Sequence, residues 1–274
     1  RDKKRLDEVF ETYHPTVVFH AAAHKHVPLM EISPAEAVKN NVLGTKNLLT
    51  SASEHDVERF VQLSTDKAVN PTSVMGCTKR ICEMLIQTFA GNTDMKCVAV
   101  RFGNVLGSHG SVIPLFEAQI KKGGPVTLTD PNIERYFMTI PEAAQLVLQA
   151  GALAEGGSIY VLDMGEPVKI MDLAKQLIRF YGYEPGVNME IKIVGLRPGE
   201  KLYEELMMDE EQGKMRRTEH NKIFVASPRD IDLAVFYQQL QDLAAAAQHN
   251  DEGVVDQLEK MIPTFTPTRK NLKV

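Results

Sequence analysis

An acid and a base stand side by side at Asp66 and Lys67, directly after the hydroxyl residues Ser64 and Thr65. The apolar run that leads into them, residues 60–64, predicts a buried strand, and the carboxyl ends of strands in open α/β sheets face the ligand crevice. Asp and Lys at such a crevice are candidates for proton transfer with a substrate. The alternative is an ordinary turn, because small polar residues are common in turns.

A second pair, Met75 and Lys79, lies within residues 73–90, where the pattern predicts a helix that ends at Gly91. Residues four apart share one face of a helix, so both side chains are expected beside Asp66 and Lys67. Met75 cannot transfer a proton, and proton transfer here would therefore depend on its neighbours. The alternative for Lys79 is a solvated surface lysine.

Two arginines are candidates for binding an anionic ligand, and a glutamate close in sequence to one of them could assist. Arg197 and Glu200 belong to the segment Arg-Pro-Gly-Glu-Lys. A planar guanidinium binds a diphosphate in a bidentate way, and Glu200 could hold Arg197 or a ribose hydroxyl. Arg135 is a weaker candidate. The alternative for each Arg is a surface ion pair.

Composition excludes several classes of protein. The chain has 274 residues with a formal net charge of -5, which argues against a general nucleic-acid binder. Three cysteines without a CxxC motif indicate reduced thiols, and no apolar run reaches membrane-spanning length, so we expect a cytoplasmic setting. His20, His24 and His26 lack nearby acidic or Cys ligands, and we therefore expect no metal.

Strands alternate with helices along the chain, which predicts a parallel, Rossmann-like α/β sheet with a smaller C-terminal lobe. The pattern assigns residues 1–108 to the sheet domain, which also receives about 136–165, and residues 109–274 mainly to the substrate-binding lobe and terminal helices. Strands are expected at 16–20, 60–64, 97–102, 126–129 and 158–163, and helices at 3–12, 34–54, 73–90, 113–121, 141–153, 170–181, 230–248 and 252–261.

The glycine-rich turn that opens a dinucleotide-binding fold is not found, because no GxGxxG occurs in the sequence. The strand at 16–20 would be the fourth of such a fold. We therefore expect that an N-terminal segment of the same protein carries the first strands and the glycine-rich loop. A chain that begins at this strand would expose a strand edge and an apolar sheet face.

Three ordered motifs carry a family resemblance: Lys-His-Val-Pro-Leu-Met-Glu at 25–31, Ser-Thr-Asp-Lys-Ala-Val-Asn-Pro at 64–71, and Arg-Phe-Gly-Asn-Val-Leu-Gly-Ser at 101–108. Together they resemble the UDP-N-acetylglucosamine 4,6-dehydratases of the polysaccharide-biosynthesis group, within the extended short-chain dehydrogenase/reductases. Met75 stands where that superfamily usually carries a catalytic Tyr, which is similar to its large, membrane-anchored branch. The parent protein is therefore expected at the inner membrane, with this domain on the cytoplasmic side.

The resemblance implies NAD as cofactor, UDP-N-acetylglucosamine or a similar UDP-sugar as substrate, a homo-oligomer, and a role in capsule or O-antigen synthesis. It also implies roles for individual residues. Catalytic residues would be Thr65, Asp66, Lys67, Met75 and Lys79; cofactor-binding residues Ala21, Ala22, Ala23, Asn41, Ser64 and Lys79; and substrate-binding residues Lys25, Asn104, Arg135, Arg197 and Glu200.

The implied reaction removes hydride from C4 of the sugar, eliminates water across C5 and C6, and returns hydride to C6. Lys67 is expected to be the C5 base, helped by burial and by Lys79, both of which would lower its pKa. Asp66 is expected to be the acid for the C6 hydroxyl, after taking the C4 hydroxyl proton, and Thr65 is expected to contact the C4 oxygen.

Two alternatives remain open from the sequence. A nucleotide-sugar 4-epimerase would use the same fold and cofactor, and it would leave the Asp66–Lys67 pair without a role at C6. An inactive fragment that only binds nucleotide sugar would fit the absent glycine-rich loop. The configuration at C5, the final glycan and the size of the oligomer do not follow from the sequence.

Overall fold

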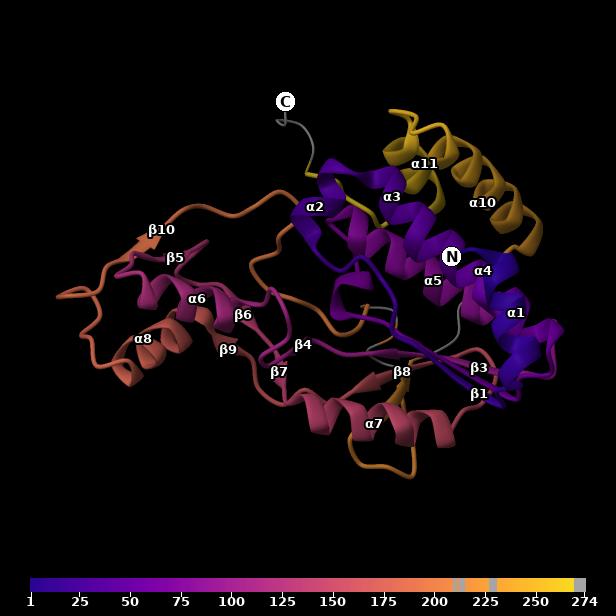
Figure 1. The fold of residues 1–274 in the computed structure, drawn as a ribbon, viewed down its shortest axis with the longest axis horizontal. Coiled ribbons are helices and arrows are strands. Elements are labelled where there is room, and N and C mark those ends of the chain that lie inside the picture. Colours follow the sequence, from indigo (N-terminus) through magenta and orange to yellow (C-terminus); the bar gives the residue numbers. More distant parts are fainter. Residues whose placement is uncertain (209–210, 212–214, 227–230, 269–274) are drawn as a thin grey trace.

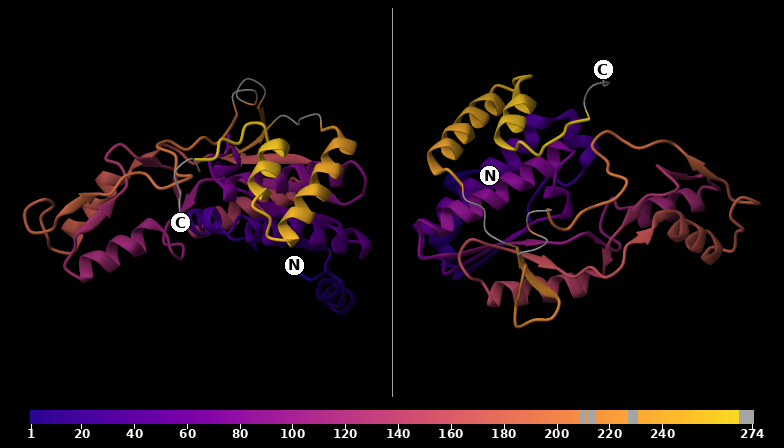
Figure 2. Two further views of the ribbon diagram at one scale, coloured as in Figure 1. Left: turned by 90° about the horizontal axis from the view of Figure 1, so that it is seen from above. Right: turned by 180° about the vertical axis from the view of Figure 1, so that it is seen from behind.

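A six-stranded sheet forms the centre of the computed structural model, which describes residues 1–208, 211, 215–226 and 231–268 (Figures 1 and 2). The first four strands in the sheet are parallel, whereas the last two run antiparallel. In spatial order they are β1 (Val17–His20), β2 (Arg59–Leu63), β3 (Lys96–Arg101), β8 (Ser158–Leu162), β12 (Ile223–Ala226) and β11 (Arg216–Arg217). The predicted Rossmann-like, mainly parallel sheet is confirmed.

Alternate residues of the central strands enter two different cores, because successive strand side chains point to opposite faces. In β3, Cys97 and Ala99 pack into the core beneath α5 (Val74–Ala90). Val98 and Val100 pack instead into the core beneath α7 (Ile140–Ala152). Figure 1 shows these two helices on opposite faces of the sheet. Burial on both faces explains why these strands read as continuous apolar runs.

The start of α5 sets the position of the predicted active-site helix. Ser73 caps this helix, since its hydroxyl accepts a hydrogen bond from the amide of Gly76 at 3.1 Å. Met75 therefore falls in the first turn, and Lys79 lies one turn later. The helix ends at Ala90, before Gly91, as its pattern predicts.

One helical path follows β1, but it is not uniform. The sequence predicts a single helix over 34–54, and the structure has α3 (Pro34–Ala37), a π-helical stretch η1 (Val38–Leu43) and α4 (Gly44–Glu54). Stretches of π-helix inside α-helices are frequent at functional positions. This one carries Asn41, whose contacts are described below.

A smaller lobe is built from α6 (Val112–Lys121), α8 (Ile170–Phe180) and three two-stranded ladders, on the left in Figure 1. Its own core contains Phe116, Ile133 and Ile178. The ladders are β5 (Val126–Leu128) with β10 (Ile191–Ile193), β6 (Glu134–Arg135) with β9 (Val168–Lys169), and β4 (Asn104–Val105) with β7 (Phe137–Met138).

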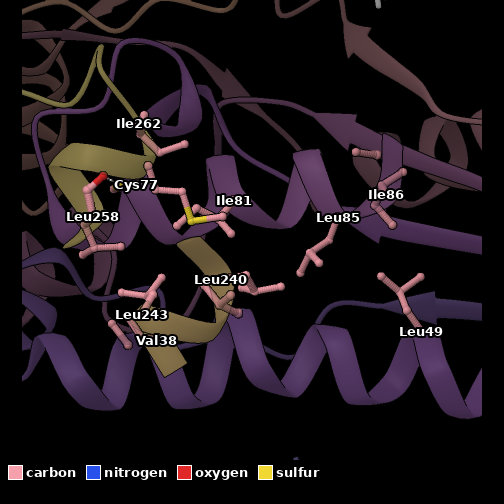
Figure 3. Packing of buried hydrophobic residues seen from close by; sticks show 14 of the residues in the cluster. Val38, Leu49, Cys77, Ile81, Leu85, Ile86, Leu240, Leu243, Leu258 and Ile262 are labelled. Carbon is pink, nitrogen blue, oxygen red and sulfur yellow. Dashed lines mark hydrogen bonds between the residues drawn. The ribbon is translucent and has the colours of Figure 1, made fainter. Parts of the chain in front are cut away.

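The C-terminal helices pack against the larger unit, which is the part of the molecule that contains the six-stranded sheet. Figure 3 shows Leu240 of α10 (Leu233–Gln248) and Leu258 of α11 (Val254–Met261) in the same cluster as Ile81 and Leu85 of α5. The sheet domain therefore extends beyond the boundary expected from the sequence, because both terminal helices and β12 belong to its core.

Several short elements were not expected from the sequence. They are α2 (Val27–Ile32), a 3-10 turn η2 (Asp66–Ala68) and the strands β4, β6, β7, β9, β10, β11 and β12. By contrast, α1 (Lys3–Tyr13) matches its prediction within a residue. β1 forms one edge of the described sheet, and Val17 and Phe19 are 40% and 43% exposed there. Within the described residues, no helix combines the length and apolar character that a membrane span requires.

Candidate active site

A pocket of about 400 Å³ opens at the carboxyl ends of β1, β2 and β3. This is the edge at which open α/β sheets bind ligands. Most residues predicted for catalysis and cofactor binding contribute to its wall, whereas Ala22, Asn41 and Asp66 do not. Among the lining residues are Ala21, Ala23, Lys25, Ser64, Thr65, Lys67, Met75, Lys79, Asn104 and Arg197.

The sheet's hydrogen-bond ladder continues into the reactive segment. The amide of Ser64 donates to the carbonyl of Val100 at 2.7 Å, and the amide of Asp66 donates to the carbonyl of Phe102 at 3.0 Å. The chain then turns through η2, where the hydroxyl of Thr65 accepts from the amide of Lys67 at 3.4 Å. The reactive side chains are therefore fixed by the sheet itself.

Asp66 lies behind the pocket wall rather than in it. Its side chain is fully buried, and Oδ1 accepts hydrogen bonds from the Thr65 hydroxyl at 2.8 Å and from Lys67 Nζ at 3.0 Å. Oδ2 is buried and has no hydrogen-bond partner among the described residues. In this arrangement Asp66 does not line the pocket but is hydrogen-bonded to Thr65 and Lys67, which do.

A second carboxylate, which the sequence did not single out, faces the same lysine. Glu204 Oε1 lies 3.4 Å from Lys67 Nζ and 3.7 Å from Arg135 Nε, and the Glu204 side chain is 3% exposed. Glu205, its neighbour, is 45% exposed and pairs with Lys201. Nothing in the spacing of the two glutamates predicts which one turns inward.

The carboxylates reverse the expectation for Lys67. Burial by itself lowers the pKa of Lys67, but Asp66 and Glu204 outweigh it and raise that pKa above its ordinary value of 10.5. Lys79 points elsewhere, since its Nζ donates to the carbonyl of Leu63 at 2.6 Å. Burial lowers the pKa of Lys67 as predicted, but the predicted net lowering is wrong, because the two carboxylates outweigh burial and Lys79 does not contribute. The pKa of Lys79 itself is lowered, chiefly by burial.

A buried network of charges holds Ser64 at the carboxyl end of β2, on the side away from the pocket. Arg101 binds Glu83 in a bidentate way, with distances of 3.0 and 2.8 Å, and binds Glu211 at 2.9 Å. The Ser64 hydroxyl donates to Glu83 at 2.7 Å, and Arg80 adds a further ion pair at 2.7 Å. Burial would raise the pKa of Glu83, but these cations hold it at about 2. Ser64 thus reaches the pocket with its hydroxyl already engaged.

Asn41 was expected at the cofactor, but its side chain makes hydrogen bonds within the protein. It is 1% exposed, and its amide donates to the carbonyl of His24 at 3.1 Å and to the Thr78 hydroxyl at 3.0 Å. Its oxygen accepts from the amide of His24 at 2.7 Å. The side chain therefore ties the loop after β1 to α5, and it shapes the pocket only indirectly.

The expected substrate residues gather around a second hollow of about 190 Å³ in the smaller lobe. Asn104, Arg135, Arg197 and Glu200 all contribute to its wall, and it shares Asn104 and Arg197 with the first pocket. Lys25 lies at the first pocket only.

The two arginines of this hollow differ in how they are engaged. Arg135 donates to the carbonyls of Glu134, Lys201 and Leu202, which uses much of its hydrogen-bonding fork. Within the described part of the chain, no hydrogen bond or ion pair engages the guanidinium of Arg197. Arg197 is therefore the better placed of the two for an anionic ligand.

Another hollow among the described residues lies away from the predicted site residues. A hollow of about 530 Å³ lies at the opposite edge of the sheet, where residues such as Asp56 and Asp94 precede β2 and β3. In the described ranges, no group of three His, Cys, Asp or Glu residues is arranged to hold a metal ion. His20 is buried and lies 2.9 Å from the Thr45 hydroxyl.

A parallel sheet, a crevice at its carboxyl edge and a lysine one turn into the following helix define an extended short-chain dehydrogenase/reductase fold. The solved structure of DesIV, a dTDP-glucose 4,6-dehydratase from Streptomyces venezuelae with NAD bound, has this fold: it matches with a TM-score of 0.69 at 18% identity, over 94% of this chain and 80% of that one. The structure of Pen from Bacillus thuringiensis matches with a TM-score of 0.75 at 37% identity, over 82% and 69%.

The chain belongs to the polysaccharide biosynthesis protein family, which it matches over residues 1–228. It is 62% identical to the capsular polysaccharide biosynthesis protein CapD of Staphylococcus aureus over 208 residues, which cover 76% of this chain and 35% of CapD. A UDP-glucose 4-epimerase of Rickettsia canadensis is 35% identical over 282 residues, covering 100% of this chain and 80% of that protein. The chain thus spans about a third of the length of CapD.

Proposed function

We propose that the protein is an NAD-dependent 4,6-dehydratase that converts UDP-N-acetylglucosamine into a 4-keto-6-deoxy sugar for polysaccharide synthesis. The observation that carries the proposal is the Thr65–Asp66–Lys67 unit, which places an acid, a base and a relaying hydroxyl at one pocket where Met75 offers no proton. A simple oxidation or epimerisation at C4 would need a base for the C4 hydroxyl, but it would leave Lys67 without a proton to remove at C5.

The pocket has features that suit a dinucleotide. Ala21 and Ala23 line it with small side chains at the end of β1, which allows a ribose to approach the backbone closely. Lys79 is held by the carbonyl of Leu63 in the same wall and would present its positive charge to a nicotinamide ribose. When bound, NAD would supply the removal of hydride from C4 and its return to C6.

The residues of the chain would move the protons. Thr65 would contact the C4 hydroxyl and pass its proton to Asp66, to which it already donates. Lys67, as a free amine, would remove the C5 proton, which the C4 ketone makes acidic. Asp66 would then return its proton through Thr65 to the departing C6 hydroxyl, which leaves as water. Finally Lys67 would give a proton back to C5.

Asp66→Asn and Lys67→Ala should each abolish dehydration in the natural full-length protein. The assay is incubation with UDP-N-acetylglucosamine and NAD, read by NMR for the C6 methyl doublet of the product. General acid–base groups typically contribute about 10²- to 10⁴-fold to a rate, so the loss should be at least of this size. Lys222→Ala, on an exposed lysine paired with Glu142, serves as the control. Dehydration that persists in either site variant would contradict the assignment.

A 4-epimerase is the second candidate, and the Rickettsia relative favours it, because the match covers 100% of this chain and 80% of that protein. The same NMR experiment separates the two functions. An epimerase would give a sugar inverted at C4 that keeps its C6 hydroxyl, and Lys67→Ala would leave that activity largely intact. Binding of the nucleotide sugar without any product would indicate that the chain is only a binding unit.

A further inference from the structure

Glu204 links the two pockets through a short chain of charges. Its Oε1 stands between Lys67 Nζ, which lines the larger pocket, and Arg135 Nε, which lines the smaller one. Three backbone carbonyls hold the Arg135 guanidinium, so this side of the carboxylate is fixed. Its other oxygen, Oε2, is buried and has no hydrogen-bond partner among the described residues.

The charges that face Lys67 create a problem for a base. They come from three elements: Asp66 from η2, Glu204 from the segment after residue 200, and Arg135 from β6. The two carboxylates outweigh the opposing charge of Arg135 and hold Lys67 as an ammonium ion, yet abstraction of a C5 proton needs a free amine. Once Asp66 has taken the proton of the C4 hydroxyl, it cannot also accept one from Lys67.

We propose that Glu204 is the positioning residue that takes one proton from Lys67 during the reaction and returns it at the end. This inference rests on the proposed dehydratase function. Nζ and Oε1 lie 3.4 Å apart as an ion pair, so a small shift of either side chain would bring them within the reach of a proton transfer. Oε2 of Glu204 is buried and engages no hydrogen-bond donor among the described residues, so no other hydrogen bond fixes that oxygen.

The protons balance over one cycle. At the start Asp66 and Glu204 are carboxylates and Lys67 is an ammonium ion. Asp66 gains the C4 hydroxyl proton, and the N–H bond of Lys67 breaks as Glu204 gains an O–H bond. Lys67 takes the C5 proton, and Asp66 gives its own to the leaving water. Lys67 then protonates C5 while hydride returns to C6, and Glu204 gives its proton back to Lys67.

The test compares Glu204→Gln with Glu205→Gln in the natural full-length protein. Glu205 is the matched control because it is the adjacent, exposed glutamate. One readout needs no activity: the pKa of Lys67 from the ¹³Cε and ¹⁵Nζ NMR shifts of labelled lysine. Loss of the Glu204 charge should lower that pKa, Glu205→Gln should leave it unchanged, and Glu204→Asp should restore part of it.

The second readout is kcat against pH. In the wild type Lys67 loses its proton internally, so the rate should be nearly flat around neutral pH. In Glu204→Gln the proton must go to solvent. The rate should fall about 10²-fold near pH 7 and rise about tenfold per pH unit towards the pKa of Lys67. A role in folding alone would lower the rate equally at every pH.

The outcomes separate the two proposals. An unchanged Lys67 pKa in Glu204→Gln, or a loss of rate that does not depend on pH, would overturn the role of Glu204. A wild-type protein that gives no methyl product would overturn the dehydratase proposal, and with it the proton cycle. A lowered Lys67 pKa together with a pH-rescued rate would support both.

Discussion

Lys67 has a different environment in the folded protein from the one its neighbours in the sequence suggest. Asp66 and Lys67 were identified as a pair because they adjoin after a strand, and they do form an ion pair of 3.0 Å. Glu204 could not be foreseen, since only the packing of the smaller lobe brings it to Lys67. Asn41 was placed at the cofactor from its motif, but its buried amide is consumed by structural hydrogen bonds.

His20 offers a test of burial at a single residue. Burial first, and the charge of Lys79 second, lower the pKa of His20 from 6.5 to about 4. The unfolded chain therefore binds more protons than the folded one below pH 6.5. This contribution to stability is complete above pH 6.5 and is lost as the pH falls towards 4.

The free energy of unfolding should fall by about 3 kcal/mol over this window because of His20. Urea unfolding at pH 7 and pH 4 measures the effect, and His20→Asn should reduce the dependence on pH. His14→Asn is the control, since His14 is exposed and adopts the left-handed conformation that Asn tolerates. If the free energy of unfolding changes equally with pH in His20→Asn and in the wild type, the explanation is refuted.

Among the secondary-structure elements, those with a clear period were predicted to within a few residues. α5 and α7 carry a cap, an apolar stripe and a defined end, and the central strands are continuous apolar runs. The two-residue strands have too few side chains to show a period. The π-helical stretch depends on how Asn41 is held by α5, which no local pattern records.

The contact between α5 and the 3-10 turn η2 can be tested at Gly76. A Cβ atom on Gly76 would overlap the carbonyl of Lys67, which is backbone and cannot move alone. Gly76→Ala should therefore displace η2, lower the free energy of unfolding by about 1–3 kcal/mol and reduce kcat.

Gly91→Ala, at the C-cap of the same helix, is the matched control. A Cβ there would lie 3.8 Å from its nearest neighbour, which is ordinary contact. Denaturant unfolding and the methyl NMR assay together check the pair. Equal stability and activity in the two variants would show that the close approach at Gly76 is not needed.

Across the whole molecule, the candidate site lies where the larger unit and the smaller lobe meet. Thr65 and Lys67 come from the end of β2, while Glu204 and Arg197 come from a segment that follows the smaller lobe. The sequence identified Thr65, Lys67 and Arg197 by their chemistry, but it did not identify Glu204 and could not show that these segments meet at one site. The sequence predicted the two terminal helices, but their apolar stripes do not reveal which partner they cover.

Arg197 should control the binding of the UDP-sugar rather than the chemical step. Its guanidinium is unengaged within the described part of the chain and lines both pockets. Arg197→Leu should raise the KM for the nucleotide sugar by about 10- to 100-fold with little change in kcat, because hydrogen bonds to charged groups contribute about 1.5–3 kcal/mol. Arg179→Leu, on the exposed surface of α8, should leave KM unchanged. A fall in kcat alone would assign Arg197 to the reaction itself.

The continuation of the sheet ladder through Ser64 and Asp66 means that the reactive segment is not a loop laid upon the fold. Its amides belong to the same cooperative unit as the central strands, which is the last part of a protein to open. The segment that carries Asp66 and Lys67 therefore stays folded as long as the central strands do. Heat or denaturant should therefore abolish activity only when the sheet itself unfolds.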